Sequence, residues 1–254
     1  SSLLISSNFF FIPTVYIAES ALQEPFLHTW SLSVEEQFYI LFPVTFFIFH
    51  KWFRTHIATL TVVGILISLQ LSEHASVYYT KLNFYLLPSR IWELLTGTLL
   101  AIFDIRYGRQ HHKFLHQVLP MLGIYLITYA ILFFNGTTPH PSFITIIPVV
   151  GTALVIIFAN RDELVGATLS SKPFVGIGLI SYSMYLWHYP VFSFARMKGN
   201  ILTNSDKVAW IILVFTLSIA TYYLIEKPFR NKVRFKARFA ITSIAAALLI
   251  TGAT

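Results

Sequence analysis

The chain has 254 residues, of which 56% are hydrophobic and only 11% are charged, whereas a soluble domain carries about 25% charged residues. This composition, with a mean hydropathy of +0.67, excludes an ordinary soluble domain and indicates a polytopic membrane protein. Cysteine is absent, which excludes disulfides and thiol chemistry. The net charge of +7 does not indicate nucleic-acid binding, because most basic residues lie in loops between apolar runs.

Apolar runs separated by short polar breaks follow one another along the chain. A bilayer core of about 30 Å needs roughly 17–25 apolar residues for each helical span. We therefore predict an all-α fold, a polytopic transmembrane helix bundle of about seven full spans with a partial span at each end. The expected spans are 1–12, 34–50, 56–71, 85–103, 115–134, 143–159, 174–195, 207–224 and 239–254.

The chain begins and stops inside apolar runs, and the last run covers only about 24 Å at about 1.5 Å per residue. We therefore expect a segment of a longer protein. There is no internal repeat and no low-complexity linker. Residues 1–254 are expected to form a single transmembrane domain, incomplete at its N-terminus, in which 239–254 starts a connector helix to a further domain.

The distribution of Lys and Arg predicts the orientation of the bundle. Thirteen of the 18 basic residues lie in four of the loops, and cytoplasmic loops carry such an excess. The loops expected in the cytoplasm are 51–55, 104–114, 160–173 and 225–238, and those expected outside are 13–33, 72–84, 135–142 and 196–206.

Two adjacent carboxylates open the second run, in the stretch HTWSLSVEEQFYILFPV at 28–44. Ser33 followed three residues later by Glu36 has the spacing of a capping box, so both are predicted to cap a helix. The side chain of Glu35 would then take no part in the cap, and it would lie about one turn into the membrane. A charge at that depth pairs with another group or lines a wet cavity, so Glu35 is a functional candidate or one half of a structural salt bridge.

A second polar group lies in LPSRIWELLTGTLLAIF at 87–103, where Arg90 and Glu93 are three residues apart. The simplest interpretation is a local i, i+3 ion pair. Alternatively, the guanidinium of Arg90 could hold Glu35 or an anionic group of a substrate.

A third group lies in GLISYSMYLWHYPVF at 178–192, where Ser181, Tyr185 and His188 share one helical stripe. Imidazole can act as acid, base or hydrogen-bond orienter near neutral pH, although a structural histidine is an equally good interpretation. His111, His112 and His116 lie instead at a basic loop, and no metal site is expected there.

The predicted topology places these groups at a similar depth. Glu35, Arg90, Glu93 and His188 all fall in the outer half of the membrane when the rise along each span is counted. Ionisable groups that meet at one depth predict a polar cavity open to the outside.

Four ordered motifs give the chain a strong resemblance to the membrane acyltransferase family 3, in the bacterial branch that carries an extracytoplasmic SGNH hydrolase-like domain after a final helix. The motifs are HTWSLSVEEQFYILFP at 28–43, RIWELLTG at 90–97, SYSMYLWHYPV at 181–191 and IEKPFR at 225–230.

The resemblance implies an O-acyltransferase of the bacterial cytoplasmic (inner) membrane. Such an enzyme moves an acetyl group from cytoplasmic acetyl-CoA to a hydroxyl of an extracytoplasmic glycan, such as lipopolysaccharide O-antigen or peptidoglycan. No bound cofactor is implied, since acetyl-CoA is the donor substrate. The expected partners are therefore acetyl-CoA, the glycan, the lipid bilayer and an SGNH-like domain of the same full-length chain, and no nucleic acid.

Site roles follow from the resemblance residue by residue. Family members carry a main catalytic histidine on a first helix and an arginine-rich donor stretch; both are missing from 1–254, so we expect this segment alone to be inactive. The supporting catalytic residues implied are Glu35, Arg90 and His188, and the substrate-binding residues are Trp30, Glu93, Tyr182 and Tyr185.

Two other functions fit the composition. A transporter of an anionic or lipid-linked sugar would also be a helix bundle with charged groups near one cavity, but carriers often show paired broken helices. Only one proline-broken motif, at 187–190, is visible here. A non-catalytic scaffold would need no intramembrane Glu or Arg.

Overall fold

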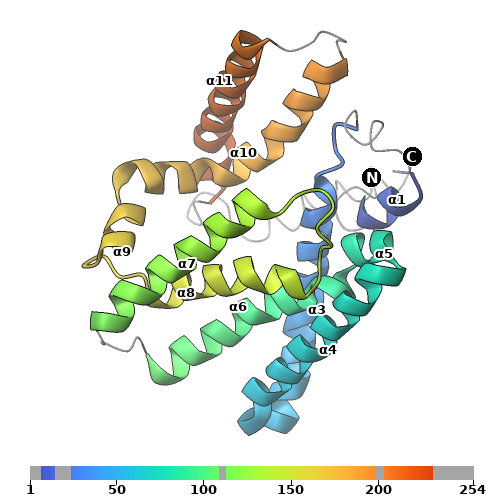
Figure 1. Ribbon diagram of the computed structural model, residues 1–254, viewed down its shortest axis with the longest axis vertical. Coiled ribbons are helices and arrows are strands. Elements are labelled where there is room, and N and C mark those ends of the chain that lie inside the picture. The colour runs from blue at the N-terminus through green and yellow to red at the C-terminus, as the bar shows by residue number, and fades with distance from the viewer. Residues whose placement is uncertain (1–6, 15–23, 109–112, 198–202, 231–254) are drawn as a thin grey trace. The chain divides into compact units, whose positions relative to one another are not determined.

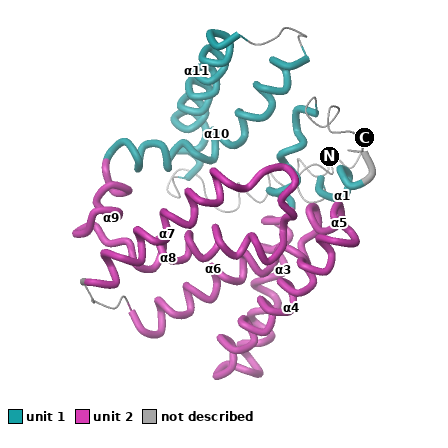
Figure 2. Tube along the Cα trace, viewed as in Figure 1, with its two compact units in different colours: residues 1–33, 172–254 teal, residues 34–171 magenta. Residues whose placement is uncertain are grey.

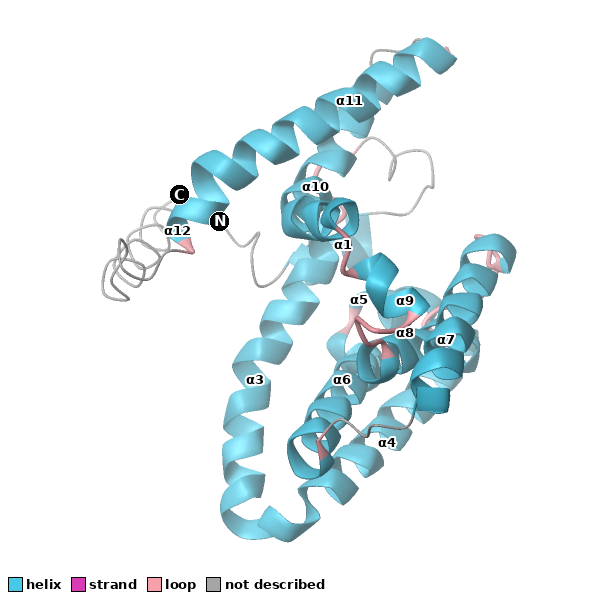
Figure 3. Ribbon diagram, turned by 90° about the vertical axis from the view of Figure 1, so that its left-hand side faces the viewer, coloured by secondary structure: helices cyan, strands magenta, loops and turns pink. Residues whose placement is uncertain are grey.

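The computed structural model describes residues 7–14, 24–108, 113–197 and 203–230. Within these ranges all regular secondary structure is helical (Figure 3), which confirms the predicted all-α class. The chain divides into two compact units (Figure 2). Unit 1 contains residues 1–33 and 172–254, and unit 2 contains residues 34–171. A single acyltransferase domain over 1–254 stays a prediction.

Unit 2 holds most of the described helices (Figure 1). Helix α4 packs along α6, α7 packs along α8, and α6 also contacts α8. The bounds are α3 Thr29–Phe53, which starts in unit 1, α4 Ile57–Tyr78, α5 Thr80–Tyr85, α6 Leu87–Tyr107, α7 Lys113–Phe133, α8 Ile146–Phe158 and α9 Leu164–Leu169, with 3-10 turns at Arg54–His56 and Phe143–Thr145.

Helices α7 and α8 of unit 2 approach each other closely at two glycines. A Cβ added to Gly123 would meet the carbonyl oxygen of Gly151 at 2.6 Å, and one added to Gly151 would meet the carbonyl oxygen of Gly123 at 2.8 Å. Small residues allow two backbones to approach this closely, as is common between helices in membranes.

Unit 1 is built on α10 (Lys172–Met197) and α11 (Asn204–Thr221), which pack against each other. Helix α11 begins at a capping box between Thr203 and Asp206. A π-helical turn and the short α12 continue it, and α1 precedes the start of α3. The bounds of these elements are α1 Ser7–Thr14, the π turn Tyr222–Glu226 and α12 Lys227–Phe229.

Polar side chains join α10 to the end of α11. Trp187 Nε1 donates to Thr221 Oγ1 at 2.8 Å, and the buried Ser183 hydroxyl donates to the carboxylate of Glu226 at 3.0 Å. The other carboxylate oxygen of Glu226 lies 3.2 Å from Nη2 of Arg230. The motif IEKPFR therefore supplies an anchor for α10.

Four helical runs of the described chain are long and apolar enough to cross a membrane, and Phe143–Phe158 is a shorter apolar helix. Large apolar side chains on these runs are exposed, as lipid-facing residues of a membrane protein would be. The four runs are Thr29–Tyr78, which includes α3 and α4, Thr80–Tyr107, Phe114–Phe133 and Asn204–Phe229.

The seven full spans expected from the sequence correspond to α3, α4, α6, α7, α8, α10 and α11. Helix α10 has 26 residues but is more polar than the four runs above, so its membrane crossing stays a prediction. Of the expected first span, α1 is described; the expected span 239–254 lies outside the described residues.

Candidate functional site

In unit 2, the start of α6 holds the Arg90–Glu93 pair. The chain is extended at Leu86, and Pro88 occupies the first helical turn, where a missing N–H costs nothing. Nη1 of Arg90 lies 3.6 Å from Oε2 of Glu93, which confirms the predicted local ion pair. Arg90 also donates from Nε to the carbonyl of Phe84 at 2.9 Å, and its guanidinium lies 5.0 Å from the centre of the Phe84 ring. The guanidinium is therefore held in place from three sides.

A serine of α4 fixes this part of α6, and a histidine of the loop before α8 lies near it. The hydroxyl of Ser68 donates to the carbonyl of Pro88 at 2.6 Å and accepts the N–H of Trp92 at 3.2 Å. Burial lowers the pKa of His140, and the positive charge of Arg90 lowers it further. The loop of His140 therefore lies within the electrostatic reach of Arg90.

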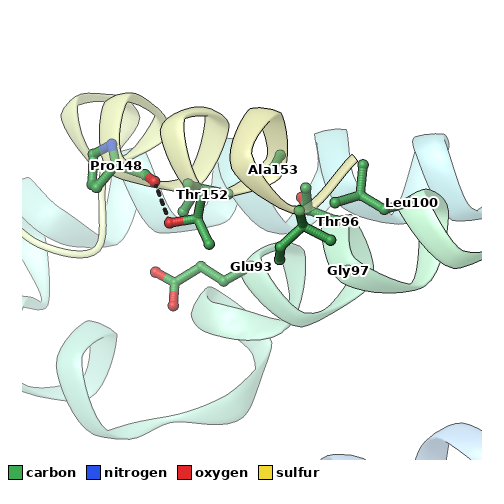
Figure 4. Close-up of a pocket in the computed structure, with 9 residues that line it drawn as sticks. Glu93, Thr96, Gly97, Leu100, Pro148, Thr152 and Ala153 are labelled. Carbon is green, nitrogen blue, oxygen red and sulfur yellow. Dashed lines mark hydrogen bonds between the residues drawn. The ribbon is translucent and has the colours of Figure 1, made fainter. Parts of the chain in front are cut away.

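A groove of about 250 Å³ runs between α6 and α8 (Figure 4). We call it the α6/α8 groove. Among the lining residues drawn in Figure 4, Glu93 is the one with a carboxylate. On the α8 side, the hydroxyl of Thr152 donates to the carbonyl of Pro148 at 2.8 Å. A Cβ added to Gly97 would meet nothing within 4 Å. The lining residues are Glu93, Thr96, Gly97, Leu100, Pro148, Val149, Thr152, Ala153 and Ile156.

The first motif differs from its prediction at the helix start. Helix α3 begins at Thr29, so Ser33 and Glu36 lie in its second turn and not at its N-cap. The hydroxyl of Ser33 lies 2.5 Å from that of Ser7 on α1. The predicted capping box is therefore wrong, because the helix starts one turn earlier and Ser33 has a distant partner instead. Glu35 is exposed, and Glu36 is half-buried.

In unit 1, His28 lies just before α3 and contacts three rings of α10. Its ring centre is 5.2 Å from that of Tyr185, 5.5 Å from that of His188 and 5.2 Å from that of Tyr189, on which it stacks. We call these four residues the ring cluster. The hydroxyl of Tyr185 donates to the carbonyl of His28 and lies 2.6 Å from the hydroxyl of Ser31.

The two imidazoles of the ring cluster differ in their hydrogen bonds. Nδ1 of His188 lies 2.6 Å from the carbonyl oxygen of Tyr185. Because a carbonyl only accepts, Nδ1 carries the proton, and Nε2 of the neutral ring carries the lone pair. His28 is only 7% exposed, and neither of its ring nitrogens has a hydrogen-bond partner among the described residues. Burial, followed by the charge of His188, lowers the pKa of His28 to about 4.

The structure thus brings the predicted residues together in two groups, Arg90 with Glu93 in unit 2 and Tyr185 with His188 in unit 1. A common cavity for both groups and Glu35 stays a prediction. Trp30 is half-buried at the start of α3, and Tyr182 is exposed on α10.

The sequence interpretation missed His28, although it opens the first motif directly before Thr29 and Trp30. Its position outside the expected span concealed its burial. His116 donates from Nδ1 to the carbonyl of Phe158 at 2.7 Å, whereas His111 and His112 lie outside the described residues.

A family model described as an acyltransferase domain matches residues 3–227. The chain belongs to the membrane acyltransferase family 3. This match confirms the family expected from the four motifs; three of them lie within the matched range, and the fourth, IEKPFR at 225–230, straddles its end.

Two relatives in this family are similar over most of the chain. O-acetyltransferase OatA of Staphylococcus aureus (strain MRSA252) is 29% identical in an alignment that covers 89% of this chain and 41% of the relative. Peptidoglycan O-acetyltransferase OatA of Listeria monocytogenes is 25% identical, with 91% and 40% covered. The chain thus spans about two fifths of the length of these relatives. No solved structure matches it.

Proposed function

We propose that this protein is a membrane O-acetyltransferase that modifies a hydroxyl of an extracytoplasmic glycan, with peptidoglycan as the first candidate. The observation that carries the proposal is the family match over residues 3–227, together with a relative named as a peptidoglycan O-acetyltransferase. Lipopolysaccharide O-antigen is the second candidate acceptor. Acetyl-CoA on the cytoplasmic face of the bacterial inner membrane is the proposed donor.

The reaction needs a base and a group that stabilises negative charge. The acceptor hydroxyl oxygen attacks the acetyl carbonyl carbon, and a base takes the hydroxyl proton. The tetrahedral oxyanion needs charge stabilisation. It then collapses, the bond to the leaving sulfur or carrier atom breaks, and that atom leaves with the electron pair. The acetyl group therefore ends as an ester on the glycan.

We assign roles to three residues by the chemistry of each one's own surroundings. His188 suits the base, because the carbonyl of Tyr185 holds its Nδ1–H and leaves the lone pair on Nε2. Arg90 suits the stabilisation of negative charge, since Glu93 and the carbonyl of Phe84 fix its guanidinium. Glu35 is assigned to orienting the acceptor or a histidine on a family helix preceding this segment.

Substrate binding is assigned to groups beside these. Glu93 lines the α6/α8 groove, whose wall is otherwise mainly apolar, so this groove suits the slender acyl-bearing arm of the donor. Trp30, Tyr182 and Tyr185 offer aromatic rings with a polar atom, which suit a sugar. A further, SGNH-like domain would act beyond the membrane domain, consistent with the share of the relatives that the chain spans.

The two adjacent carboxylates provide the test with a matched control. Glu35→Gln and Glu36→Gln are made in the complete protein, in cells without another O-acetyltransferase. Acetate released from purified peptidoglycan by mild alkali is measured, with the membrane level of each variant. We expect Glu35→Gln to lose the O-acetyl groups and Glu36→Gln to keep them.

Each contrary outcome has its own meaning. Retained O-acetyl groups in Glu35→Gln would reject the role of Glu35. Unmodified glycan in cells with the wild-type protein, tested for peptidoglycan and for lipopolysaccharide, would reject the function. Labelled acetyl-CoA offered to wild-type membranes separates the enzyme from a transporter, because only the enzyme moves label to glycan.

A further inference from the structure

A second cavity, of about 320 Å³, adjoins the α6/α8 groove toward the end of α6. We call it the Tyr107 pocket. Leu100 lines both cavities, and in Figure 4 it lies at the opposite end of the labelled stretch of α6 from Glu93. The wall of the Tyr107 pocket includes Leu100, Phe103, Asp104, Tyr107, His116 and Phe158.

The two cavities lie along one face of each helix, and we call them together the trough. The lining residues of α6 recur at intervals of three or four positions from Glu93 to Tyr107, and those of α8 do so from Pro148 to Ile157. Such spacing places residues on one side of a helix. The fourteen residues from Glu93 to Tyr107 span about 21 Å at about 1.5 Å per residue. The trough is therefore long and lies wholly within unit 2.

The trough is accessible along α6. Gly97, in its middle, is exposed, and a Cβ added there would meet no atom of the described residues within 4 Å. At the far end, Phe103 and Tyr107 are 48% and 58% exposed. A ligand can therefore reach the lining residues from outside the fold, and it is the lack of a side chain at Gly97 that leaves the middle open.

The Tyr107 end presents aromatic faces with charged groups beside them. The rings of Phe103 and Tyr107 stack with their centres 5.7 Å apart, and the guanidinium of Arg106 lies 5.6 Å from the centre of the Tyr107 ring. Aromatic faces bind nucleobases by stacking, and a guanidinium binds phosphate. The carboxylate of Asp104, which also lines this pocket, accepts hydrogen bonds from an amino group. This end therefore suits a nucleotide.

The other end of the trough presents a carboxylate beside a fixed cation. Glu93 lines the groove, and its Oε2 lies 3.6 Å from Nη1 of Arg90. Between the two ends the wall is mainly apolar, apart from the hydroxyls of Thr96 and Thr152. Each hydroxyl donates to a carbonyl of its own helix and keeps lone pairs that can accept. An extended arm with amide N–H groups uses such acceptors, whereas a lipid tail uses none.

We propose that the trough binds a coenzyme A thioester as one extended ligand, with its nucleotide at the Tyr107 pocket and its acyl group at Glu93, beside Arg90. This inference rests on the proposed O-acetyl transfer and adds to it the route of the donor. The Tyr107 end is also the end of α6 that the distribution of Lys and Arg places in the cytoplasm, where acetyl-CoA is the proposed donor.

The test measures donor binding to the purified complete protein in detergent micelles, so that it does not depend on the glycan. Titration calorimetry compares acetyl-CoA with S-acetylpantetheine, which has the arm and the thioester but no nucleotide. Gly97→Leu fills the middle of the trough, Tyr107→Leu removes an aromatic face, and Tyr107→Phe keeps the ring. Gly176→Leu on α10 is the matched control, because a Cβ there likewise meets no described atom within 4 Å and Gly176 lines neither cavity.

We expect Gly97→Leu to weaken the binding of both ligands by about tenfold or more, since one misplaced methylene group in an apolar site costs about 10–200-fold. Tyr107→Leu should weaken acetyl-CoA about tenfold, the effect of losing one stacked base, and leave S-acetylpantetheine unchanged. Tyr107→Phe should recover most of that loss, and Gly176→Leu should bind both ligands as the wild type does. The melting temperature of each variant is measured beside its affinity. If Gly97→Leu does not fold, Thr152→Leu narrows the trough from α8.

Wild-type affinity for acetyl-CoA in a folded Gly97→Leu or Thr152→Leu protein would overturn the inference, and a loss of co-purifying phospholipid in the same variant would assign the trough to a lipid tail. Equal losses of both ligands in Tyr107→Leu would contradict the place given to the nucleotide. A wild-type protein that fails to bind one or both ligands would also reject the trough as the donor site. The proposed function fails in a different way, when the wild-type protein binds acetyl-CoA but passes no labelled acetyl group to a glycan.

Discussion

The contact between α7 and α8 in unit 2 is formed by two buried glycines, whereas the ring cluster in unit 1 is formed by side chains, of which His28 is buried and the other three are half-buried. At Gly123 and Gly151 two backbones meet without side chains, and the apolar neighbours Leu126 and Val155 close the contact. In the ring cluster, side chains of His and Tyr meet, and the nitrogens of His28 have no hydrogen-bond partner among the described residues. The first contact leaves no polar side chain to do chemistry, whereas the second keeps two imidazoles together at the expense of stability.

Lowering the pH is expected to produce the largest difference between the two regions, because it should change the free energy of unfolding through the ring cluster alone. The pKa of His28 is lowered from 6.5 to about 4 in the folded protein. Above pH 6.5 the ring is neutral in both states; between pH 6.5 and 4 only the unfolded chain takes the proton, so the folded state loses stability. By pH 4 the loss should reach about 3 kcal/mol.

The measurement is the free energy of unfolding of the purified complete protein in mixed detergent micelles, from pH 7.5 to 4. His28→Phe should flatten this part of the curve. Equal slopes for His28→Phe and the wild type would show that the ring cluster does not hold His28 neutral.

The glycine contact should respond to size and not to pH. In Gly151→Ala the new Cβ would lie 2.8 Å from the carbonyl oxygen of Gly123, so α7 and α8 must move apart. Such overpacking is expected to lower the free energy of unfolding by about 2 kcal/mol.

Gly178→Ala on α10 is the control, since an added Cβ there meets nothing within 4 Å. Alanine in an open helical position should stabilise slightly, by up to about 1 kcal/mol. If both variants have the same melting temperature in detergent, the close approach of α7 and α8 does not require a glycine at position 151.

Sequence patterns predicted the helices well because apolar periodicity and length are local properties. The local ion pair of Arg90 and Glu93 followed from spacing for the same reason. The cap at Ser33 did not, because its hydroxyl meets Ser7, 26 residues earlier. Contacts of that kind depend on tertiary packing, which also decides how the first motif starts its helix.

The ring cluster shows the same limit for function. His188 could be proposed from its place inside an apolar run, whereas His28 lies before the run and becomes buried only when α10 packs on it. Gly123 and Gly151 are 28 residues apart in sequence, and no local pattern shows that they face each other. Residues whose role depends on a partner from another helix were the ones that the sequence could not identify.

A smaller loss of stability is expected where α10 contacts the IEKPFR motif, at a serine two residues before Tyr185 of the ring cluster. Ser183→Ala removes the donor to the Glu226 carboxylate at 3.0 Å. A hydrogen bond to a charged group contributes about 1.5–3 kcal/mol, and the lower end is expected because Arg230 still pairs with Glu226.

The control variant is Ser181→Ala. The hydroxyl of Ser181 is exposed and donates to the carbonyl of Gly178 on its own helix. Unfolding in mixed micelles should show a clear loss for Ser183→Ala and almost none for Ser181→Ala. A similar loss in both would mean that the Ser183–Glu226 contact contributes no more than a local helix bond.

The smallest effect is expected one turn further along α10, where Nε1 of Trp187 donates to Thr221 at 2.8 Å. Both groups are neutral, and a neutral hydrogen bond contributes about 1 kcal/mol. Because Trp187→Phe also removes ring volume, the hydrogen bond is isolated by a double-mutant cycle with Thr221→Val. The coupling free energy should be about 1 kcal/mol, and a coupling of zero would show that packing alone joins α10 to α11. Neither substitution should change the slope of stability between pH 6.5 and 4, because neither residue titrates in that range; a changed slope would mean that the α10–α11 contact also sets the burial of His28.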